Sequence, residues 1–517
     1  MAGRNGVGRC LSVALNGLEG RVVEVEADIG NTLPGFVILG LPDAALSESR
    51  DRIRACAANS GIPLSRRKIT VNLFPASLPK RGSGFDLAIA VASIAANGEI
   101  RGTEGVVFLA ELGLDGRLRP VRGVLPAVAA AVKAGHPRVV VAQGNAAEAC
   151  LVPGAEVSSY RTFARLVFDF GADPKELNLD FDPAESEGKG ETAELPVPVP
   201  DLADVAGQHE ARFALEVAAA GAHHMLMVGP PGAGKTMLAE RLPGLLPPLD
   251  DEAALEVTSI HSLATQGEVR TELIRQPPFE NPHHTATSAA IVGGGAGLPR
   301  PGAASRAHRG VLFLDEAPEY ERRVLDALRQ PLEHGKLVIH RAGGSASYPS
   351  RFQLLLAANP CPCGKASGKG LECTCTPLAR RRYFGRLSGP LLDRVDIQLG
   401  VQKISRLDLD SQGENEDTAV VRERVRRARQ AQRERLGRFG LETNSMVPGK
   451  ILRGGLRPDR VTTRILDAAM DRGSLSARGY DRVLRLAWTL ADLAGETTPN
   501  SDHVGLALAL RSPEAAA

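Results

Sequence analysis

The chain has 517 residues, of which 43% are hydrophobic and 24% are charged, and its formal net charge is +2. This length allows about three domains with real cores, and the small net charge means that any basic surface is local. Because no run of about 18 apolar residues occurs, we expect no membrane span. The N-terminus lacks the apolar core of a secretory signal. Seven cysteines, four of them clustered, fit a reducing cytoplasm better than a disulfide framework, so we expect a cytoplasmic protein.

The first segment, residues 1–178, mixes β-rich runs with helical ones. Residues 21–27 alternate polar and apolar side chains over most of their length, as a half-buried strand does. Further strand candidates are residues 36–39, 69–73 and 106–109, and helix candidates are residues 44–59 and 124–133. Pro126 is tolerable because it falls in the first turn of its helix. This segment therefore combines strand and helix candidates.

Residues 179–200 are acidic and contain Gly and Pro, so they have little to bury and should form an exposed linker. Residues 201–400 alternate apolar strands with helices, which predicts a parallel α/β sheet. Residues 401–517 are mostly helical. They include a strongly basic helix candidate at 421–439 and a helix pair at 462–471 and 480–493.

The most specific motif is GPPGAGKT, which follows the apolar run 225–228 and precedes a helix-permissive stretch. It fits G-x-x-x-x-G-K-[ST] in the required strand–loop–helix context. Backbone amides of such a loop cradle a phosphate at a helix N-terminus. The lysine reaches the outer phosphates and the threonine hydroxyl ligates Mg²⁺. The predicted ATP-binding residues are Gly229, Pro230, Pro231, Gly232, Ala233, Gly234, Lys235 and Thr236.

Two acids end the apolar run 311–314. A buried strand would place Asp315 at its carboxyl end, beside the phosphate loop, where ligands of such sheets bind. Asp315 would then hold Mg²⁺ together with Thr236, and Glu316 would polarise the attacking water as a general base. An apolar run followed by two acids is weak evidence alone, but it follows Lys235 within the same α/β segment.

Another apolar run, residues 354–358, ends in Asn359, whose amide could orient the water between the γ-phosphate and the glutamate. A simple turn before Pro360 is the alternative. Arg394 suits a finger that acts on a neighbouring subunit's phosphoryl group; a surface salt bridge with Asp393 or Asp396 is the alternative. Arg478, at the start of the last long helix, could approach the γ-phosphate and report hydrolysis.

Two C-x-C units separated by nine residues contain Cys361, Cys363, Cys373 and Cys375. Four thiolates suit a closed tetrahedral Zn²⁺ site, although C-x₂₋₄-C is the usual spacing. A disulfide pair is the alternative, but it fits a reducing cytosol poorly. Because the cluster directly follows Asn359, a structural zinc there would couple the nucleotide sensor to the rest of the assembly.

Two regions offer cations to a nucleic acid. Residues 336–348 suggest a hairpin on which Lys336, His340 and Arg341 could contact phosphates, with a solvated hairpin as the alternative. The basic helix is either solvated or a phosphate-binding face; its arginines are Arg422, Arg424, Arg426, Arg427, Arg429, Arg433 and Arg435. For His283 and His284 we favour a structural or substrate-facing role over metal binding.

The ordered blocks GPPGAGKT, VLFLDE, AANPCPCG, SGPLLDRVDI and SARGYDRVLRLA resemble the ComM/YifB family of magnesium-chelatase-like AAA+ ATPases over nearly the whole chain. The resemblance implies an AAA+ core with a helical lid and a homohexameric ring. It also implies that Asn359 is sensor 1, Arg394 the arginine finger, Arg478 sensor 2, and Asp204–Gln208 the adenine-pocket segment. By the same resemblance, an extra hairpin at about 270–300 projects toward the ring pore.

Two residues depart from the family pattern: Glu280 stands where a basic residue is usual, and Ala303 where a glutamate is usual. A lost cation near a pore would weaken DNA contact locally. Residues 79–86 and 115–123 resemble the Lon-protease fold, whose active members use a serine–lysine dyad. Here Gly84 and Leu125 stand at the dyad positions and Ser83 is one residue away, so we expect a proteolytically inactive Lon-like α+β domain.

The resemblance implies an ATP-driven hexameric DNA motor. It would bind single-stranded or branched DNA and promote branch migration in recombination and natural transformation. The alternative is a chaperone-like motor that remodels a protein complex, as in magnesium chelatase. The Lon-like domain favours the first, since chelatase motor subunits lack it, and Gly84 and Leu125 disfavour a Lon-related protease.

Overall fold

The computed structural model describes residues 6–31, 33–40, 44–78, 80, 82–181, 199–264, 270–295, 299–341, 344–366, 372–404 and 415–511. The chain forms two compact units. Unit 1 comprises Met1–Pro196, Glu252–Ile274 and His340–Ser347, and unit 2 comprises Val197–Asp251, Arg275–Ile339 and Tyr348–Ala517. Most of the predicted linker, residues 182–198, lies outside the described residues.

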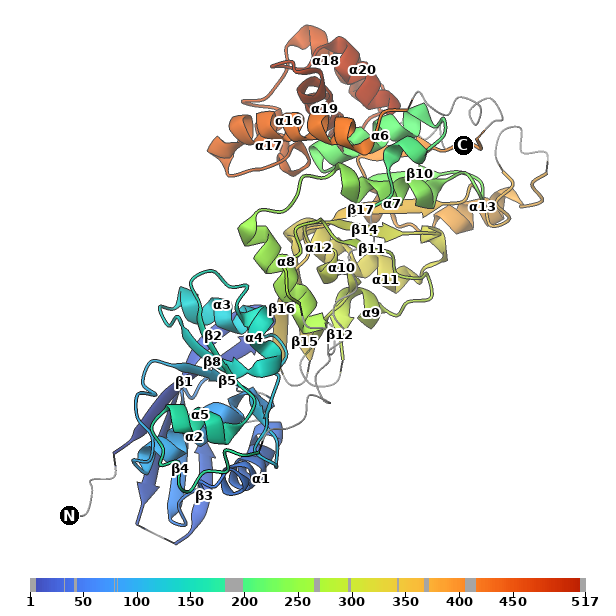
Figure 1. Ribbon diagram of the computed structural model, residues 1–517. Helices are drawn as coiled ribbons and strands as arrows, with labels where there is room; N and C mark the ends of the chain where they lie inside the picture. The colour runs from blue at the N-terminus through green and yellow to red at the C-terminus, as the bar shows by residue number, and fades with distance from the viewer. Residues whose placement is uncertain are drawn as a thin grey trace. The chain divides into compact units, whose positions relative to one another are not determined.

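Unit 1 contains a seven-stranded sheet in the order β3-β4-β2-β1-β5-β8-β9 (Figure 1). β1 pairs antiparallel with β2, and β2 with β4, whereas the pairs β3–β4, β1–β5, β5–β8 and β8–β9 are parallel. The strands are β1 (Gly8–Asn16), β2 (Glu19–Gly30), β3 (Gly35–Leu39), β4 (Lys68–Phe74), β5 (Val107–Leu109), β8 (Arg138–Ala142) and β9 (Glu156–Tyr160), with a small hairpin of β6 (Glu111–Leu112) and β7 (Leu118–Arg119).

The helices of unit 1 are α1 (Ala44–Asn59), α2 (Asp86–Ala96), α3 (Val124–Lys133), α4 (Ala146–Ala149), α5 (Phe163–Asp169) and nearly all of α8 (Asp251–Ala264). Both helices predicted for this segment, residues 44–59 and 124–133, occur with those bounds. The predicted elements do not include α2, because every residue of α2 except Ala95 is buried and no polar stripe marks a helical period. Leu255 of α8 packs in a cluster with Val124 and Val128.

The residues at or near the positions of the Lon serine–lysine dyad have other partners. The Ser83 hydroxyl donates a hydrogen bond to the Glu111 carboxylate. Leu125 is fully buried in the core. Lys80 is also buried, and its ammonium donates to the carbonyl of Leu73 at 2.9 Å; burial lowers its pKa. Ser83 is therefore paired with a carboxylate, and Lys80 is paired with a backbone carbonyl. Residues 79 and 81 of the resembling block lie outside the described residues.

Unit 2 is built on a five-stranded sheet in the order β11-β14-β17-β10-β18 (Figure 1). Its strands are β10 (Met225–Val228), β11 (Phe279–Glu280), β14 (Val311–Leu314), β17 (Gln353–Ala358) and β18 (Ile397–Gly400), and all four neighbouring pairs are parallel. Every residue of β10, β14 and β17 is buried, as expected for a parallel sheet covered on both faces. The predicted parallel α/β sheet is confirmed.

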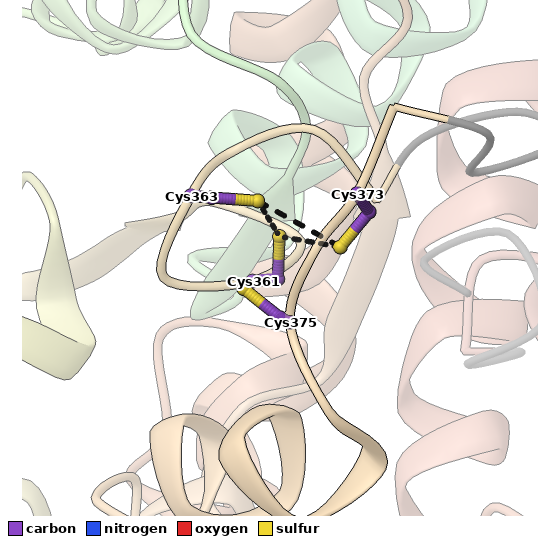
Figure 2. A group of neighbouring side chains, drawn as sticks. All are labelled: Cys361, Cys363, Cys373 and Cys375. Carbon is purple, nitrogen blue, oxygen red and sulfur yellow. Dashed lines mark hydrogen bonds between the residues drawn. The ribbon is translucent and has the colours of Figure 1, made fainter.

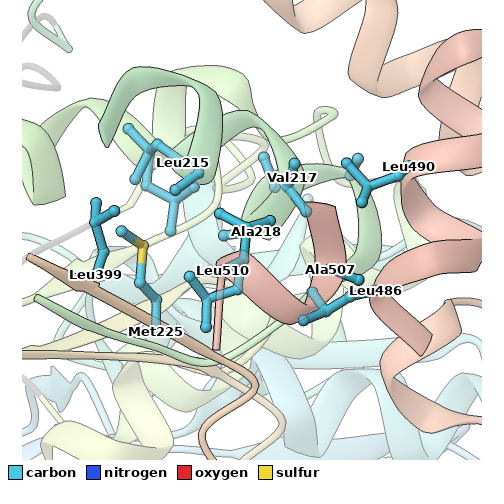
Figure 3. Close-up of a cluster of buried hydrophobic side chains, with 14 of the residues drawn as sticks. Leu215, Val217, Ala218, Met225, Leu399, Leu486, Leu490, Ala507 and Leu510 are labelled. Carbon is cyan, nitrogen blue, oxygen red and sulfur yellow. The ribbon is translucent and has the colours of Figure 1, made fainter. Parts of the chain in front are cut away.

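The helices of unit 2 share a core with this sheet. They are α6 (His209–Gly221), α7 (Lys235–Leu245), α9 (Ser288–Val292), α10 (Ala303–Arg306), α11 (Arg322–Ala327), α12 (Arg329–His334), α13 (Pro377–Phe384), α14 (Gly389–Leu392), α16 (Thr418–Leu436), α17 (Gly449–Leu452), α18 (Arg460–Asp471), α19 (Ala477–Ala494) and α20 (Ser501–Ala509). Leu215 of α6, Met225 of β10, Leu399 of β18 and Leu486 of α19 belong to one buried cluster (Figure 3). The C-terminal helices therefore pack as part of the sheet's own core.

The arginines of the basic helix α16 mostly bind other parts of unit 2. Arg424 forms ion pairs with Glu216 and Glu416, each at 2.6 Å. Arg435 pairs with Asp492 at 2.5 Å and lies over the ring of Trp488. Three more contacts are those of Arg422 with the Gly244 carbonyl, Arg429 with the Ala219 carbonyl and Arg426 with Glu423. The bonds of Arg422, Arg424, Arg429 and Arg435 attach the helix to its neighbours, which favours a structural role for these four arginines. Arg426 and Arg427 pair with Glu423 of the helix itself and, like Arg433, are exposed, so both predicted alternatives stay open for them.

Two hairpins interrupt the α/β alternation. β15 (Lys336–Arg341) and β16 (Gly344–Pro349) form a two-stranded sheet directly before β17, as predicted. The Arg341 side chain lies outside what the structure describes. At the end of the predicted 270–300 region, β12 (Gly293–Gly294) pairs antiparallel with β13 (Arg300–Pro301). Among the described residues, no helix has both the length and the apolar character that a bilayer crossing requires.

Candidate nucleotide-binding site

The glycine-rich loop joins β10 to α7 in the unit 2 sheet. Gly232 and Gly234 have φ of 76° and 84°, a left-handed region that favours glycine. A Cβ on Gly229 would come within 2.2 Å of the Val401 carbonyl oxygen, so only glycine fits there. The Gly229 amide also donates to the Ala358 carbonyl at 3.1 Å. The loop is therefore held against the ends of β17 and β18, and α7 begins at Lys235 with its N-terminus facing the loop.

Lys235 lies over this loop. Its ammonium donates to the carbonyls of Gly229 at 2.8 Å and Pro230 at 3.0 Å, and to Oδ1 of Asn359 at 3.3 Å. The side chain is buried, and burial lowers its pKa. The predicted phosphate ligand and the predicted sensor thus lie in direct contact.

The two residues predicted to hold Mg²⁺ are also brought together. The Thr236 hydroxyl donates to Oδ2 of Asp315 at 2.7 Å, although the two are far apart in sequence. Oδ1 of Asp315 accepts the Glu316 amide at 2.8 Å, which fixes the carboxylate plane. A hydroxyl and a carboxylate beside a phosphate-binding loop are the hard oxygen ligands that Mg²⁺ prefers, so these residues fit the ion.

The predicted adenine-pocket segment reaches the same loop. Gln208 has φ of 53° and directly precedes α6. Its side-chain amide donates to the Gln402 carbonyl at 2.6 Å and the Ala233 carbonyl at 3.3 Å. Gln208 therefore ties the segment before α6 to the phosphate loop and to the chain after β18.

Glu316 has a partner that the sequence pattern did not predict. Its Oε2 lies 3.3 Å from Nδ1 of His284, in the loop after β11. β11 is parallel to β14, so the residues that follow both strands meet at one edge of the sheet. β11 has only two residues, which is too short to show a period in the sequence. The adjacent histidines themselves were therefore the only sequence signal for this contact.

Glu280, one of the two departures from the family pattern, lies in β11. Its carboxylate accepts two hydrogen bonds from Arg306, at 2.9 Å and 2.7 Å. The acid is therefore compensated by an arginine of α10, and it stabilises the strand that leads to His284. The second departure, Ala303, is buried at the start of α10.

Arg394 and Arg478 do not lie with Lys235. β18 runs parallel to β10 with Ile397 opposite Met225, so Arg394 precedes the amino end of the sheet whereas the phosphate loop follows its carboxyl end. Four residues of strand separate these ends by about 13 Å. Arg394 pairs with Glu333, and Arg478 pairs with Asp393 at 3.1 Å. Both arginines therefore gather at the end opposite the loop.

The four clustered cysteines converge (Figure 2). Sγ of Cys361 lies 3.3 Å from that of Cys363 and 3.6 Å from that of Cys373, and all four sulfurs lie within 4.8 Å of one another. A disulfide needs about 2.05 Å between sulfurs. Zn–S bonds of about 2.3 Å place tetrahedral sulfurs about 3.8 Å apart. The donor set therefore fits a bound zinc ion better than a disulfide.

The cysteine loop rests on the phosphate loop. Gly364 has φ of 74°, and its amide donates to the Cys361 carbonyl at 2.9 Å. A Cβ on Gly364 would lie 2.7 Å from Cγ and Cδ of Pro231. A displacement of the cysteine loop would therefore change its contact with Pro231 of the phosphate loop.

Three family descriptions match consecutive parts of the chain: "Subunit ChlI of Mg-chelatase" over residues 25–145, "Magnesium chelatase, subunit ChlI" over 201–409, and "Magnesium chelatase, subunit ChlI C-terminal" over 415–511. An uncharacterized protein of Mycobacterium tuberculosis is 50% identical over 508 residues, 98% of each chain. Competence protein ComM of Haemophilus influenzae is 40% identical over 507 residues, 97% of this chain and 96% of its own. The uncharacterized protein YifB of Escherichia coli is 38% identical over 511 residues, 96% of this chain and 95% of its own.

The contact between the two loops predicts the effect of Gly364→Ala. The added methyl group would meet Pro231 and would also force alanine into a left-handed conformation, so the phosphate loop must shift. A shift that costs about 1 kcal/mol in the bound state lowers nucleotide affinity about fivefold. Titration with a fluorescent ATP analogue measures this loss.

Gly505→Ala is the matched control, because no atom lies within 4 Å of the added Cβ and Gly505 is part of α20. Its affinity should equal that of the wild type. Equal affinities for both variants, with unchanged melting temperatures, would contradict the proposed contact.

Proposed function

Because the chain belongs to the ComM/YifB family of magnesium-chelatase-like AAA+ proteins, which implies ATPase activity, we propose that it is an ATP-driven hexameric DNA motor. The relative named ComM is described as a competence protein. We therefore infer a branch-migration helicase in the cytoplasm that acts on single-stranded or branched DNA during recombination and natural transformation.

The observation that carries the ATPase proposal is the convergence of Lys235, Thr236, Asp315 and Asn359 at one edge of the sheet. Lys235 and the loop amides bind the phosphates. Thr236 and Asp315 hold Mg²⁺, which neutralises phosphate charge when bound. Glu316 polarises the attacking water and Asn359 orients it.

The positions of the arginines support a ring. Arg394 and Arg478 lie at the amino end of β18, about 13 Å of strand away from the phosphate loop of their own chain. We infer a head-to-tail ring in which that end of one subunit would face the nucleotide of its neighbour. We infer that both residues stabilise the transition state in the adjacent subunit's site, with the C-terminal helices α16–α20 acting as the lid.

DNA contact is proposed at the β15–β16 hairpin. Along β15, Leu337 and Ile339 are buried whereas Lys336 and His340 are exposed, so the cations lie on the outer face. Phosphate contact needs only positioned cations.

The alternative, a chaperone-like motor that remodels a protein, is favoured by one observation: all three family descriptions name a magnesium-chelatase subunit.

For unit 1 we propose a proteolytically inactive Lon-like domain that serves ring assembly or DNA contact. The hydrogen bond of Ser83 to the carboxylate of Glu111, and the apolar Leu125 at the expected lysine position, support this proposal over a Lon-related protease. A carboxylate can accept the serine proton, but a Ser–Lys dyad is what the active fold uses.

One prediction of this proposal concerns ATP turnover across a panel of DNA structures. We expect single-stranded or branched DNA to stimulate hydrolysis.

Glu316→Gln should lower kcat at least about 100-fold while still binding ATP, because only the general base is lost. Lys235→Ala should weaken ATP binding roughly 10- to 100-fold through loss of a charge-assisted hydrogen bond. Phosphate release and equilibrium binding measure the two effects.

Normal hydrolysis by either variant would remove its proposed role. Hydrolysis that no DNA stimulates, but that a protein client does stimulate, would decide for the chaperone-like alternative. The unmodified chain in the same assay is the reference for both.

A second prediction tests action between subunits. Lys235→Ala and Arg394→Ala should each be inactive, the latter by about 10³-fold or more. Mixing the two should restore hydrolysis, because some interfaces then join an intact Lys235 to an intact Arg394. Arg478→Ala should likewise be inactive alone and should recover hydrolysis when mixed with Lys235→Ala. The control is a mixture of Lys235→Ala with the double variant Lys235→Ala/Arg394→Ala, which contains no such interface. Inactivity of every mixture would refute action in trans.

We also propose that Cys361, Cys363, Cys373 and Cys375 hold a structural zinc ion, because their sulfurs have the spacing of a tetrahedral site. The ion would fix the loop that rests on Pro231.

The corresponding prediction is that protein purified without chelators contains about one zinc ion per chain by elemental analysis. Cys363→Ser and Cys373→Ser should lower this content, because serine is a poor zinc ligand. Cys150→Ser, which alters an exposed cysteine outside the cluster, should leave it unchanged. Wild-type protein that holds no zinc would end the proposal.

A further inference from the structure

The loop after β11 brings His284 to the residue proposed as the general base. Nδ1 of His284 lies 3.3 Å from Oε2 of Glu316. The two belong to neighbouring parallel strands, with Phe279 opposite Val311 and Glu280 opposite Leu312. The contact is therefore built by the sheet and does not follow from closeness in sequence.

The loop is anchored before it reaches His284. The buried Tyr320 donates its hydroxyl proton to the carbonyl of Pro282, two residues before the imidazole. On the strand side, Arg306 binds Glu280 through two hydrogen bonds at 2.9 Å and 2.7 Å. These bonds on both elements leave His284 little freedom to move away from the edge of the sheet.

The second histidine, His283, has a different partner. Nδ1 of His283 lies 2.8 Å from the Thr285 hydroxyl, and the His283 and His284 ring centroids are 4.2 Å apart. His283 is exposed and His284 is half-buried. The pair therefore presents one imidazole to Glu316 and turns the other to solvent.

Glu316 needs such a partner. Its backbone is fixed in an unusual conformation, with φ of 49° and its amide bonded to Asp315. Its side chain, however, is 47% exposed. Holding a glutamate side chain in one rotamer costs conformational entropy. Without a contact, the carboxylate would seldom face a particular water molecule.

We propose that His284 is a positioning residue for Glu316. It holds one carboxylate oxygen so that the other faces the water that attacks the terminal phosphate of ATP. His284 acts through Glu316 and needs no contact with the nucleotide. The inference rests on the proposed ATPase function.

The test compares steady-state hydrolysis and ATP binding for His284→Ala, His284→Asn and His283→Ala. A general base contributes roughly 10²–10⁴-fold, so His284→Ala should lower kcat about tenfold or more. KM and ATP affinity should stay within about twofold, since no binding group is removed. His284→Asn, whose amide can donate from the position of Nδ1, should recover part of the loss. His283→Ala is the control and should stay within about twofold of wild type.

A double-mutant cycle separates positioning from a structural effect. In the Glu316→Gln background, His284→Ala should cause no further loss, because the group on which it acts has gone. An unchanged or raised kcat for His284→Ala, or an equal loss in both backgrounds, would overturn the proposal. If His284→Ala fails to fold, the asparagine variant carries the same comparison. A wild-type chain that hydrolyses no ATP would overturn the proposed function itself.

Discussion

The nucleotide site depends on the register of three parallel strands. Val228 of β10 lies opposite Ala358 of β17, and Leu314 of β14 lies opposite Leu356 of the same strand. The residues that follow these strands therefore meet at one edge. The hydrogen bonds Thr236–Asp315 and Lys235–Asn359 are the direct consequence. A slip of one residue would turn each side chain to the opposite face of the sheet and separate these pairs.

The opposite edge of the same sheet is tied to the C-terminal helices. His223, just before β10, bonds to Asp396 at 3.0 Å and to Thr489 of α19 at 2.8 Å, and all three side chains are buried. The hydrogen bond from His223 holds the pKa of Asp396 down to about 2 against the effect of burial. Satisfied polar networks of this kind fix one geometry. Arg478 lies in the first turn of α19, so this network connects the sheet to the helix that carries one of the proposed trans-acting residues.

Local patterns predicted the elements that have a clear period or a motif, such as α1, α3, β10 and β14. The family resemblance is confirmed as well. The contact of Thr236 with Asp315 followed from the motifs, but two other contacts at this edge of the sheet were not predictable. The pairing of His284 with Glu316 depends on a two-residue strand, and the packing of Gly364 on Pro231 depends on a left-handed turn. The charge of α16 suggested solvent or DNA, because its acidic partners, Glu216 and Asp492, lie on other helices.

Two loops from outside the glycine-rich motif thus reach the proposed nucleotide site: the histidine loop contacts Glu316, the proposed general base, and the cysteine loop contacts Pro231 of the phosphate loop. Both lie at the carboxyl edge of the sheet, whereas Arg394 lies at the amino edge. One chain therefore holds the phosphate-loop residues at one edge of the sheet and the arginine proposed to stabilise charge at the other. Half-sites at opposite ends of one subunit can complete each other in a head-to-tail arrangement, which closes into a ring when rotational symmetry relates the subunits. The hexamer that the family resemblance implies is the reason that we propose a ring rather than a two-fold dimer.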